Sequence, residues 1–400
     1  MLSFEEARAR IAGCEAHPVA ERVPLFSADG RVLAEDVHAR APVPPWDTSA
    51  MDGYAVRVAE LTVDAPTRLP VRGESRTGAA PEPLAPGAAM RIFTGAVLPE
   101  GADAVVMQED VAREADVAVF RARPAALANV RRRGEDLEEG ALALAKGTRL
   151  GPAQVGLLAS LDRGEVLVAR RPEVVILATG DELRPPGSCP RPASIPESNG
   201  LALAAMVVRA GGRVRVCPAV GDDGAATARA VEDALRGADL LLTIGGVSVG
   251  DHDVVRPALV AAGVEIDFWK VAMKPGKPLA VGRRGATWVL GLPGNPVSAL
   301  VTFALFGVPL LRTLSGDRAP VAPWLPARLA RAVRRRPGRS EFLRATLDVK
   351  NDQLIATPVA HQASGALVGL AAATALVALP AEAGDLEEGA AVSVVRLGDL

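Results

Sequence analysis

The sequence predicts a multidomain protein of the α/β plus β class, and three observations support this. The chain has 400 residues, and a guide of roughly 150 residues per domain suggests two to four domains. A pattern of strand, glycine loop and helix repeats over 171–317, which predicts a three-layer α/β domain with a mostly parallel sheet. Short alternating strands fill 46–139 and 318–400, which predicts a small mostly β domain and a C-terminal β-barrel-like domain.

Composition excludes several classes of partner. Hydrophobic residues make up 49% of the chain and the formal net charge is -2, so packed cores are expected and a nucleic-acid partner is not. Three widely spaced cysteines fit neither a disulfide framework nor a metal site. Two apolar stretches, 285–311 and 361–381, approach membrane-spanning length but contain prolines, repeated glycines or polar residues. We therefore expect a cytoplasmic protein with no membrane partner.

The first segment, 1–45, opens with an amphipathic helix and continues into a strand-like stretch at 30–36. Pro42, Pro44 and Pro45 then exclude regular structure and indicate a crossing between domains. Helical spacing returns in 140–170, where Pro152 suits a first helical turn. This later segment is compatible with rejoining the first one in a single discontinuous domain.

The segment between them, 46–139, is rich in valine, glycine and proline. Its short alternating runs include Ala104–Met107 and Val117–Phe120, which are typical of strands. We expect the small, mostly β second domain here.

The third segment, 171–317, alternates strands and helices, with glycines and acids after the strands. A buried run such as Leu240–Ile244 is typical of a central strand in a parallel sheet. Ligands bind beyond the carboxyl ends of such strands, so this edge is the first candidate site. The expected strands are 174–178, 214–220, 240–244 and 288–290, and the expected helices are 199–210 and 225–236.

The last segment, 318–400, begins with prolines and a basic run at 331–339. The stretches EFLRATLDV, QLIATPV and AVSVVRL alternate as strands do. We interpret Arg334, Arg335 and Arg336 as a solvated hairpin face.

Glycines and acids follow the expected strands of the third segment. Gly245 and Gly246 open a loop that can approach a ligand closely. Carboxylates gathered at one sheet edge suit Mg²⁺, although each acid taken singly also fits as a helix N-cap. His252 fits a solvated loop histidine. The acids concerned are Asp181, Glu182, Asp222, Asp223, Asp251 and Asp253.

Lysines are the second candidate feature. The chain has five, and Lys270, Lys274 and Lys277 lie together in FWKVAMKPGKP. An ammonium group is a compact charge that suits phosphate or another oxyanion, and an exposed turn is the alternative. The loop GLPGNP, with Pro293, Gly294 and Asn295, precedes an apolar helix whose first amides are available to an anion. A plain turn and cap is the competing interpretation of that loop.

Together these residues resemble the molybdopterin molybdotransferase family, to which the C-terminal domain of gephyrin is related. The resemblance covers nearly the whole chain. Seven motifs occur in the family's order: PPWDTSAMDGYAV, RIFTGAVLPEGADAVVMQED, VRRRGEDLEEG, ILATGDEL, TIGGVSVGDHD, FWKVAMKPGKPLAVG and GLPGNPVSALVTF.

The resemblance implies a four-domain fold whose first domain is discontinuous and elongated, comprising 1–45 and 140–170. It also implies a homodimer in which the third domain of one subunit faces the second domain of its mate. Asp52, Thr94 and Glu109 would then reach a composite site built mainly by the partner.

The implied reaction inserts molybdenum from molybdate into adenylylated molybdopterin and releases AMP with the help of Mg²⁺. The molybdopterin adenylyltransferase is an implied partner. The implied catalytic residues are Asp52, Asp136, Glu182, Asp223, Asp253, Lys270 and Lys274, with Asp223 and Asp253 at the metal. The implied binding residues are Thr94, Gly245, Gly246, Ser248, Lys277, Pro293, Gly294, Asn295 and Ser364.

This chain departs from the family pattern at Glu197, where an aspartate often precedes the Ser-Asn pair. Two other functions stay open. An adenylyltransferase would share the α/β fold, but GGVSVG replaces its GGTG-like loop. A scaffolding protein would keep the fold without turnover, and the intact acids and lysines favour catalysis over it.

Overall fold

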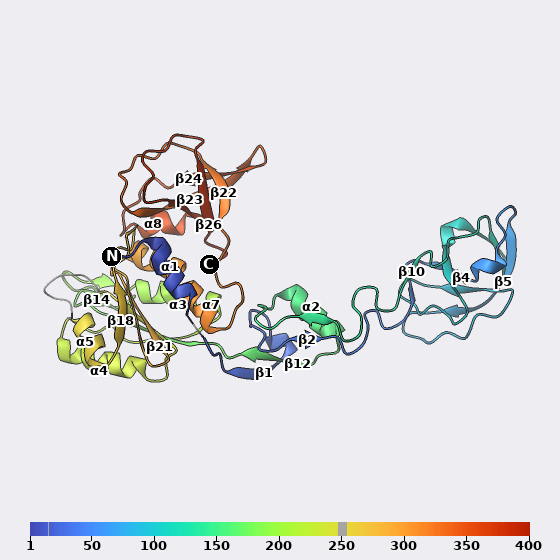
Figure 1. Cartoon of the computed structure of the whole chain (residues 1–400), viewed down its shortest axis with the longest axis horizontal. Coiled ribbons are helices and arrows are strands. Elements are labelled where there is room, and N and C mark those ends of the chain that lie inside the picture. Colours follow the sequence, from blue (N-terminus) through green and yellow to red (C-terminus); the bar gives the residue numbers. More distant parts are fainter. Residues whose placement is uncertain (15, 247–253) are drawn as a thin grey trace.

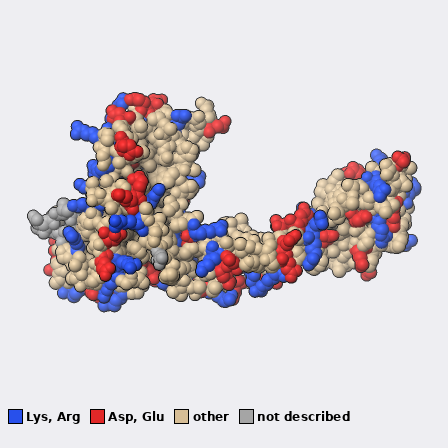
Figure 2. Space-filling model, viewed as in Figure 1, with Lys and Arg blue, Asp and Glu red and all other residues tan. Residues whose placement is uncertain are grey.

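The computed structural model describes residues 1–14, 16–246 and 254–400. The molecule is elongated, with an α/β domain and the C-terminal barrel together at one end and a β domain at the other (Figure 1). A slender lobe connects the two ends. Acidic and basic side chains are interspersed on the face shown in Figure 2, in keeping with the small net charge.

The slender lobe is built from two separate chain segments. Strand β1 (Ala20–Pro24) pairs antiparallel with β12 (Glu165–Ala169), and β2 (Val37–His38) pairs with β11 (Leu142–Leu144). Helix α2 (Pro152–Ser160) packs against them. Both segments contribute to one core, which includes Val23, Leu33, Leu150, Leu158 and Val168.

Two details of the first segment differ from expectation. No strand covers 30–36, where the described backbone makes only isolated bridges from Val32 and Leu33. Helix α1 (Phe4–Ala12) packs between the central domain and the C-terminal barrel, because Phe4 lies against Phe306 of the former and Phe342 of the latter, with ring centroids 5.4 and 4.6 Å away. Its apolar face is therefore buried away from the lobe that the sequence assigned to it.

The distal β domain contains one mixed sheet in the order β7-β4-β6-β5-β9-β8. Tyr54, Val56 and Phe120 fill its core, and Tyr54 meets Phe120 edge to face at 6.2 Å. The short pair β3 (Thr48–Ser49) and β10 (Val130–Arg131) forms the neck. The strands are β4 (Gly53–Val56), β5 (Thr67–Ser75), β6 (Ala89–Ile92), β7 (Ala104–Met107), β8 (Val111–Glu114) and β9 (Val117–Phe120).

The central domain contains a sheet in the order β16-β13-β17-β21-β20-β18, whose first four strands are parallel. Strands β20 and β18 continue it antiparallel. Strand β16 is shorter than expected, and β21 is longer by two residues at its carboxyl end. The strands are β13 (Glu173–Ala178), β16 (Arg213–Val216), β17 (Leu240–Ile244), β18 (Glu265–Trp269), β20 (Ala280–Arg284) and β21 (Thr287–Leu292).

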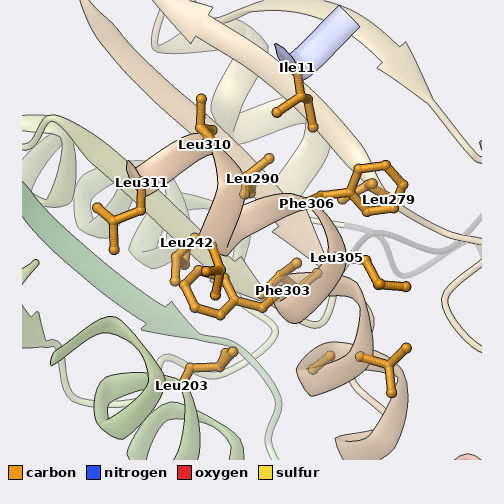
Figure 3. Packing of buried hydrophobic residues seen from close by; sticks show 14 of the residues in the cluster. Ile11, Leu203, Leu242, Leu279, Leu290, Phe303, Leu305, Phe306, Leu310 and Leu311 are labelled. Carbon is orange, nitrogen blue, oxygen red and sulfur yellow. The ribbon is translucent and has the colours of Figure 1, made fainter. Parts of the chain in front are cut away.

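Helices cover both faces of this sheet, as expected for a three-layer domain. Helix α4 (Gly224–Leu235) and helix α5 (Val255–Ala261) bury one face of strand β17 through Leu241. The other face packs against α3 (Asn199–Ala210) and a long apolar helix (Figure 3). Alternate residues of each strand thus point into two separate cores.

The long apolar helix runs from Pro296 to Leu314 and consists of α6 (Pro296–Thr302), a π-helical turn η4 (Phe303–Gly307) and α7 (Val308–Leu314). Its length and composition would allow it to cross a membrane, but 78% of its most apolar stretch is buried inside the fold. Phe303, Phe306 and Leu310 project into the central core (Figure 3). It serves as a core helix here.

The C-terminal domain is a closed five-strand barrel in the order β23-β24-β22-β26-β25, with β25 pairing back to β23. A two-residue strand of the central domain, β19 (Met273–Lys274), adds to the start of β23. Helix α8 (Leu367–Ala371) lies beside the barrel. The strands are β22 (Leu325–Leu329), β23 (Ser340–Lys350), β24 (Gln353–Pro358), β25 (Ala375–Leu379) and β26 (Ala391–Arg396).

Candidate functional site

A cavity of 310 Å³ opens at the carboxyl ends of the parallel strands. Gly245 and Gly246 line it, both with positive φ (85° and 58°). A Cβ on Gly245 would lie 2.9 Å from the carbonyl oxygen of Thr179, and one on Gly246 would lie 2.8 Å from Cβ of Val255. Glycine is needed at both positions because the turn follows a buried strand without space for a side chain.

Backbone hydrogen bonds connect the ends of neighbouring strands at this cavity. The amide of Thr179 donates to the carbonyl of Ile244 at 3.0 Å, and the amide of Gly245 donates to that of Leu292 at 3.1 Å. The loop after β21 is tied in as well, because Nδ2 of Asn199 donates to the carbonyl of Gly294 at 2.8 Å. Three loops that are far apart in the sequence are therefore fixed around one space.

The acids at these strand ends divide into two groups. Glu182 and Asp222 line the cavity. Asp181 connects two loops, since its Oδ1 accepts from the amide of Asp222 at 3.1 Å. Asp223 is the N-cap of α4 and accepts from the amide of Ala226 at 2.6 Å, so the cap that the sequence left open is present.

The sequence did not lead us to expect a pocket role for Glu197 and Asn199, which both line this cavity. Asn199 is almost fully buried, and Glu197 accepts from the amide of Gly200 at 2.7 Å. No lysine or arginine occurs among the described lining residues. The charged groups of the lining, Glu182, Glu197 and Asp222, are therefore all acceptors, which suit the N–H groups of a heterocycle better than a phosphate. The sequence feature that could have indicated their pocket role is Glu-Ser-Asn at the start of a helix that follows a glycine-containing loop.

The lysine segment lies at the junction of the central domain and the barrel. Lys270 has φ 90°, a backbone conformation that is uncommon outside glycine. Lys274 and Lys277 are exposed. Lys274 pairs with β23 of the barrel through the short strand β19.

A second cavity, of 630 Å³, is lined by Lys274 together with arginines of the basic run. That run was interpreted as a solvated face, which holds for the exposed Arg334 and Arg336 but is wrong for Arg335. The side chain of Arg335 is only 3% exposed, and Arg334 and Arg336 line the cavity. The basic run therefore contains one buried arginine, Arg335, and its exposed arginines border the cavity.

The Gly-Leu-Pro-Gly-Asn-Pro loop meets the C-terminal domain at Ser364. The amide of Val297, in the first turn of α6, donates to the carbonyl of Ser364 at 3.0 Å. Pro293 is buried, whereas Gly294 and Asn295 are exposed, and Asn295 makes no side-chain cap. Ser364 therefore lies beside the expected anion loop, although it comes from another domain.

A buried arginine holds the loop that carries Ser364. Arg344 is 1% exposed, and its guanidinium donates to the carbonyls of His361, Ala363 and Ala366 at 2.7, 3.2 and 3.1 Å. Its Nε also donates to Oε1 of Gln362. Burial lowers the pKa of Arg344. The loop is thus a fixed element.

The structure does not bring the distal predicted residues to this site within one chain. Asp52, Thr94 and Glu109 are next to strands β4, β6 and β7 of the distal β domain, and Asp136 lies between β10 and β11. The pocket is lined by residues of the α/β domain, which is at the opposite end of the molecule (Figure 1). Oδ1 of Asp52 accepts from the amide and hydroxyl of Thr94 at 2.7 and 2.8 Å. These bonds lower the pKa of Asp52.

Four predicted or considered positions, Ser248, Asp251, His252 and Asp253, lie outside the described residues. Over the described ranges, no three His, Cys, Asp or Glu side chains come together as metal ligands. Asp223 is committed to capping a helix. The other acid predicted at the metal, Asp253, is among the residues that are not described.

An α/β domain with a ligand pocket at its strand ends, set within a longer multidomain chain, is the class of protein that these observations describe. Residues 175–313 match the model of a probable molybdopterin binding domain. Residues 2–161 match the MoeA N-terminal region, domains I and II, and residues 326–397 match the MoeA C-terminal region, domain IV.

Relatives with curated names resemble the whole chain. A protein named molybdopterin molybdenumtransferase 2 from Mycobacterium tuberculosis is 39% identical over 94% of both chains. The molybdopterin molybdenumtransferase of Haemophilus influenzae is 35% identical over 98% of both. This chain belongs to the molybdopterin molybdenumtransferase (MoeA) family. Among solved structures, a molybdopterin biosynthesis MoeA protein from Pyrococcus horikoshii superimposes with TM-score 0.85, covering 99% of this chain and 100% of that one at 29% identity.

Proposed function

We propose that this protein inserts molybdenum from molybdate into adenylylated molybdopterin and releases AMP. The observation that carries the proposal is the presence of two unlike cavities in the half of the molecule that holds the α/β domain and the barrel. One is lined by acidic, apolar and glycine residues, and the other is lined by Lys274 and four arginines together with the acids Glu341 and Asp385. The first suits the pterin and the second suits an oxyanion. The names of the curated relatives support molybdenum transfer to molybdopterin, and the adenylylated substrate and AMP release come from the resemblance in sequence.

The chain's own residues would mainly bind and orient the reactants. Lys274 and Lys277 provide cationic groups that hold molybdate or phosphate oxygens and offset charge on the leaving nucleotide. At the start of α6, Pro296 has no amide hydrogen and the amide of Val297 already donates to Ser364, so this helix start adds little to anion binding. Glu182 lines the pterin pocket and is our candidate for orienting the pterin's N–H groups.

We propose that the working form is a homodimer with composite sites. Asp52 is held by Thr94 on an exposed surface, far from the pocket of its own chain (Figure 1). A second copy that places this surface over the pocket would complete the site without any change within the chain. Asp136 and Glu109 would enter by the same route.

Mg²⁺ dependence stays a prediction from the sequence, because Asp253, one of the two acids predicted at the metal, lies outside the described residues. We therefore assign no step to the metal. A cytoplasmic location and an adenylyltransferase that supplies the substrate also remain predictions.

The test is to incubate the protein with adenylylated molybdopterin and follow AMP release with and without molybdate, at several Mg²⁺ concentrations. Molybdate-dependent release is expected. Net synthesis of the adenylylated pterin from ATP would instead support the adenylyltransferase alternative. Binding of the pterin without turnover under any metal would support the scaffolding alternative.

Glu182→Ala is expected to abolish release, and Glu165→Ala is the control. Glu165 is a glutamate on β12 of the slender lobe and lines neither cavity. Equal rates for Glu182→Ala and the wild type would remove Glu182 from the site.

A further inference from the structure

Glu341 joins two cations that come from different domains. Its Oε1 lies 2.7 Å from Nζ of Lys274 in the central domain, and its Oε2 lies 3.2 Å from Nε of Arg335 in the barrel domain. The side chains of Glu341 and Arg335 are only 11% and 3% exposed. The pair with Arg335 is therefore weakened less by solvent than a surface pair is, whereas Lys274 is 56% exposed and its pair is shielded on the Glu341 side only.

The backbone fixes this arrangement on both sides. Lys274 and Glu341 are directly opposite each other where β19 pairs with β23. The amide of Ser340 donates to the carbonyl of Ala272 at 3.0 Å, next to that pair. Arg335 is held independently, since its guanidinium also donates to the carbonyls of Ala383 and Arg339. The carboxylate therefore meets Lys274 at a defined point.

The same carboxylate lines the basic cavity of 630 Å³. Asp385, the other acid in its lining, accepts from the amide of Arg335 at 2.8 Å and lies 3.6 Å from Arg334. Arg336 and Arg339 make no side-chain ion pair with any described residue. A negative charge beside Lys274 opposes an incoming anion. The carboxylate of Glu341 therefore weakens anion binding at Lys274, and we expect an effect on Lys274 that offsets this loss.

We propose that Glu341 is a positioning residue for Lys274, which lowers anion affinity but holds the ammonium group where transfer requires it. The inference rests on the proposed function, because it takes Lys274 as an anion-binding residue. Removing the charge while keeping the shape, as in Glu341→Gln, frees Lys274 from its partner. Anion binding and turnover then change in opposite directions.

The experiment measures molybdate binding by calorimetry and, separately, kcat and KM for molybdate in the transfer assay. Glu341→Gln should bind molybdate about threefold more tightly or better, since one like charge has been removed. Its kcat should fall about tenfold, because a loosely held catalytic group loses productive geometry. Glu341→Asp keeps the charge, so its molybdate affinity should stay near that of the wild type while kcat is intermediate.

Glu21→Gln is the matched control, because Glu21 pairs with the buried Arg31 in the slender lobe and lines neither cavity. It should leave molybdate affinity and kcat unchanged. Weaker or unchanged molybdate binding by Glu341→Gln would overturn the inference, as would absence of molybdate binding by the wild type. Tighter binding without any transfer by the wild type would overturn the proposed function and leave the effect of Glu341 on anion affinity standing.

Discussion

At the residue scale, the hydrogen bonds from Thr94 to Asp52 can be tested one at a time through the pKa of Asp52. The amide and the hydroxyl of Thr94 both donate to one carboxylate oxygen, and both favour the charged form. The folded pKa of Asp52 therefore lies below its unfolded value. The stability that follows is present above the unfolded pKa and is lost as pH falls through the folded pKa.

Thr94→Val removes the hydroxyl donor and keeps the amide. We expect the pKa of Asp52 to rise, although it should stay below the usual aspartate value because one donor remains. Carboxyl-carbon NMR titration of Asp52 measures this directly. Thr77→Val, on the neighbouring loop, is the control and should leave that pKa in place, because Thr77 donates to the carbonyl of Thr94 and not to Asp52. An unchanged pKa in Thr94→Val would show that the amide alone sets it.

Arg344 is a buried cation that donates to side-chain amide and backbone carbonyl oxygens among the described residues. Arg344→Met would leave the carbonyls of His361 and Ala366 without the donor that Arg344 provides, whereas the carbonyl of Ala363 keeps its bond from the amide of Ala366. We expect a loss of about 3 kcal/mol in the free energy of unfolding of the barrel, since unpaired buried acceptors each cost about 1–3 kcal/mol.

Urea unfolding measures this loss, and hydrogen exchange across 359–367 should increase in the same variant. Arg328→Met is the comparison, because Arg328 is exposed on the same barrel and donates to Gln353 and Gly389. Similar losses in the two variants would show that burial of Arg344 is not what matters.

At the element scale, the loop after β17 depends on glycine for two separate reasons. Gly246 needs positive φ, and a Cβ there would meet Val255 at the start of α5. Gly237, before the same strand, also has positive φ (73°) but has no atom within 4 Å of a Cβ position. A substitution at Gly237 therefore tests backbone strain alone, whereas one at Gly246 tests backbone strain together with steric conflict.

We expect Gly237→Ala to cost about 1–2 kcal/mol of unfolding free energy, the usual penalty for a left-handed backbone. Gly246→Ala should cost more and should also weaken binding of the pterin substrate, because α5 or the loop must move. Denaturant unfolding and ligand titration of both variants test this. If both variants lost the same stability, close packing at Gly246 would be unimportant.

At the scale of the whole molecule, the distance between the Asp52 surface and the pocket makes a direct prediction. If sites are shared between subunits, Asp52→Ala and Glu182→Ala each disable both sites of their own homodimer. When the two variants are mixed and allowed to exchange subunits, heterodimers form in which one of the two sites has both residues intact. About a quarter of wild-type activity should return in an equal mixture, since half the dimers are mixed and each has one good site.

The measurement is AMP release before and after exchange, with oligomeric state followed by light scattering. The control mixture combines Glu182→Ala with Lys274→Ala. It should not restore activity, because both residues belong to the subunit that carries the pocket. No recovery in the mixture of Asp52→Ala and Glu182→Ala, with exchange confirmed, would place all site residues within one chain.

Local patterns predicted much of the fold. Leu240–Ile244 and Asn199–Ala210 occur as predicted, because a buried apolar run and a helical period are local signals. Helix α1 was placed with the wrong neighbours, since its apolar face does not specify which core it joins. The prediction of a solvated basic run holds for Arg334 and Arg336 but is wrong for Arg335, because charge alone does not reveal that this side chain is buried beside Glu341.

The strand-end glycines, the acids after the strands and the cluster of lysines could all be found from the sequence, because each depends on residues adjacent in the chain. Which of these groups share a space could be learned only from the folded chain. There, Asp222 lies in the pocket while Asp223 caps a helix, Lys274 pairs with Glu341, and Asp52 is at the far end. The physical reason is that contacts between distant segments depend on how whole elements pack, which no local pattern encodes.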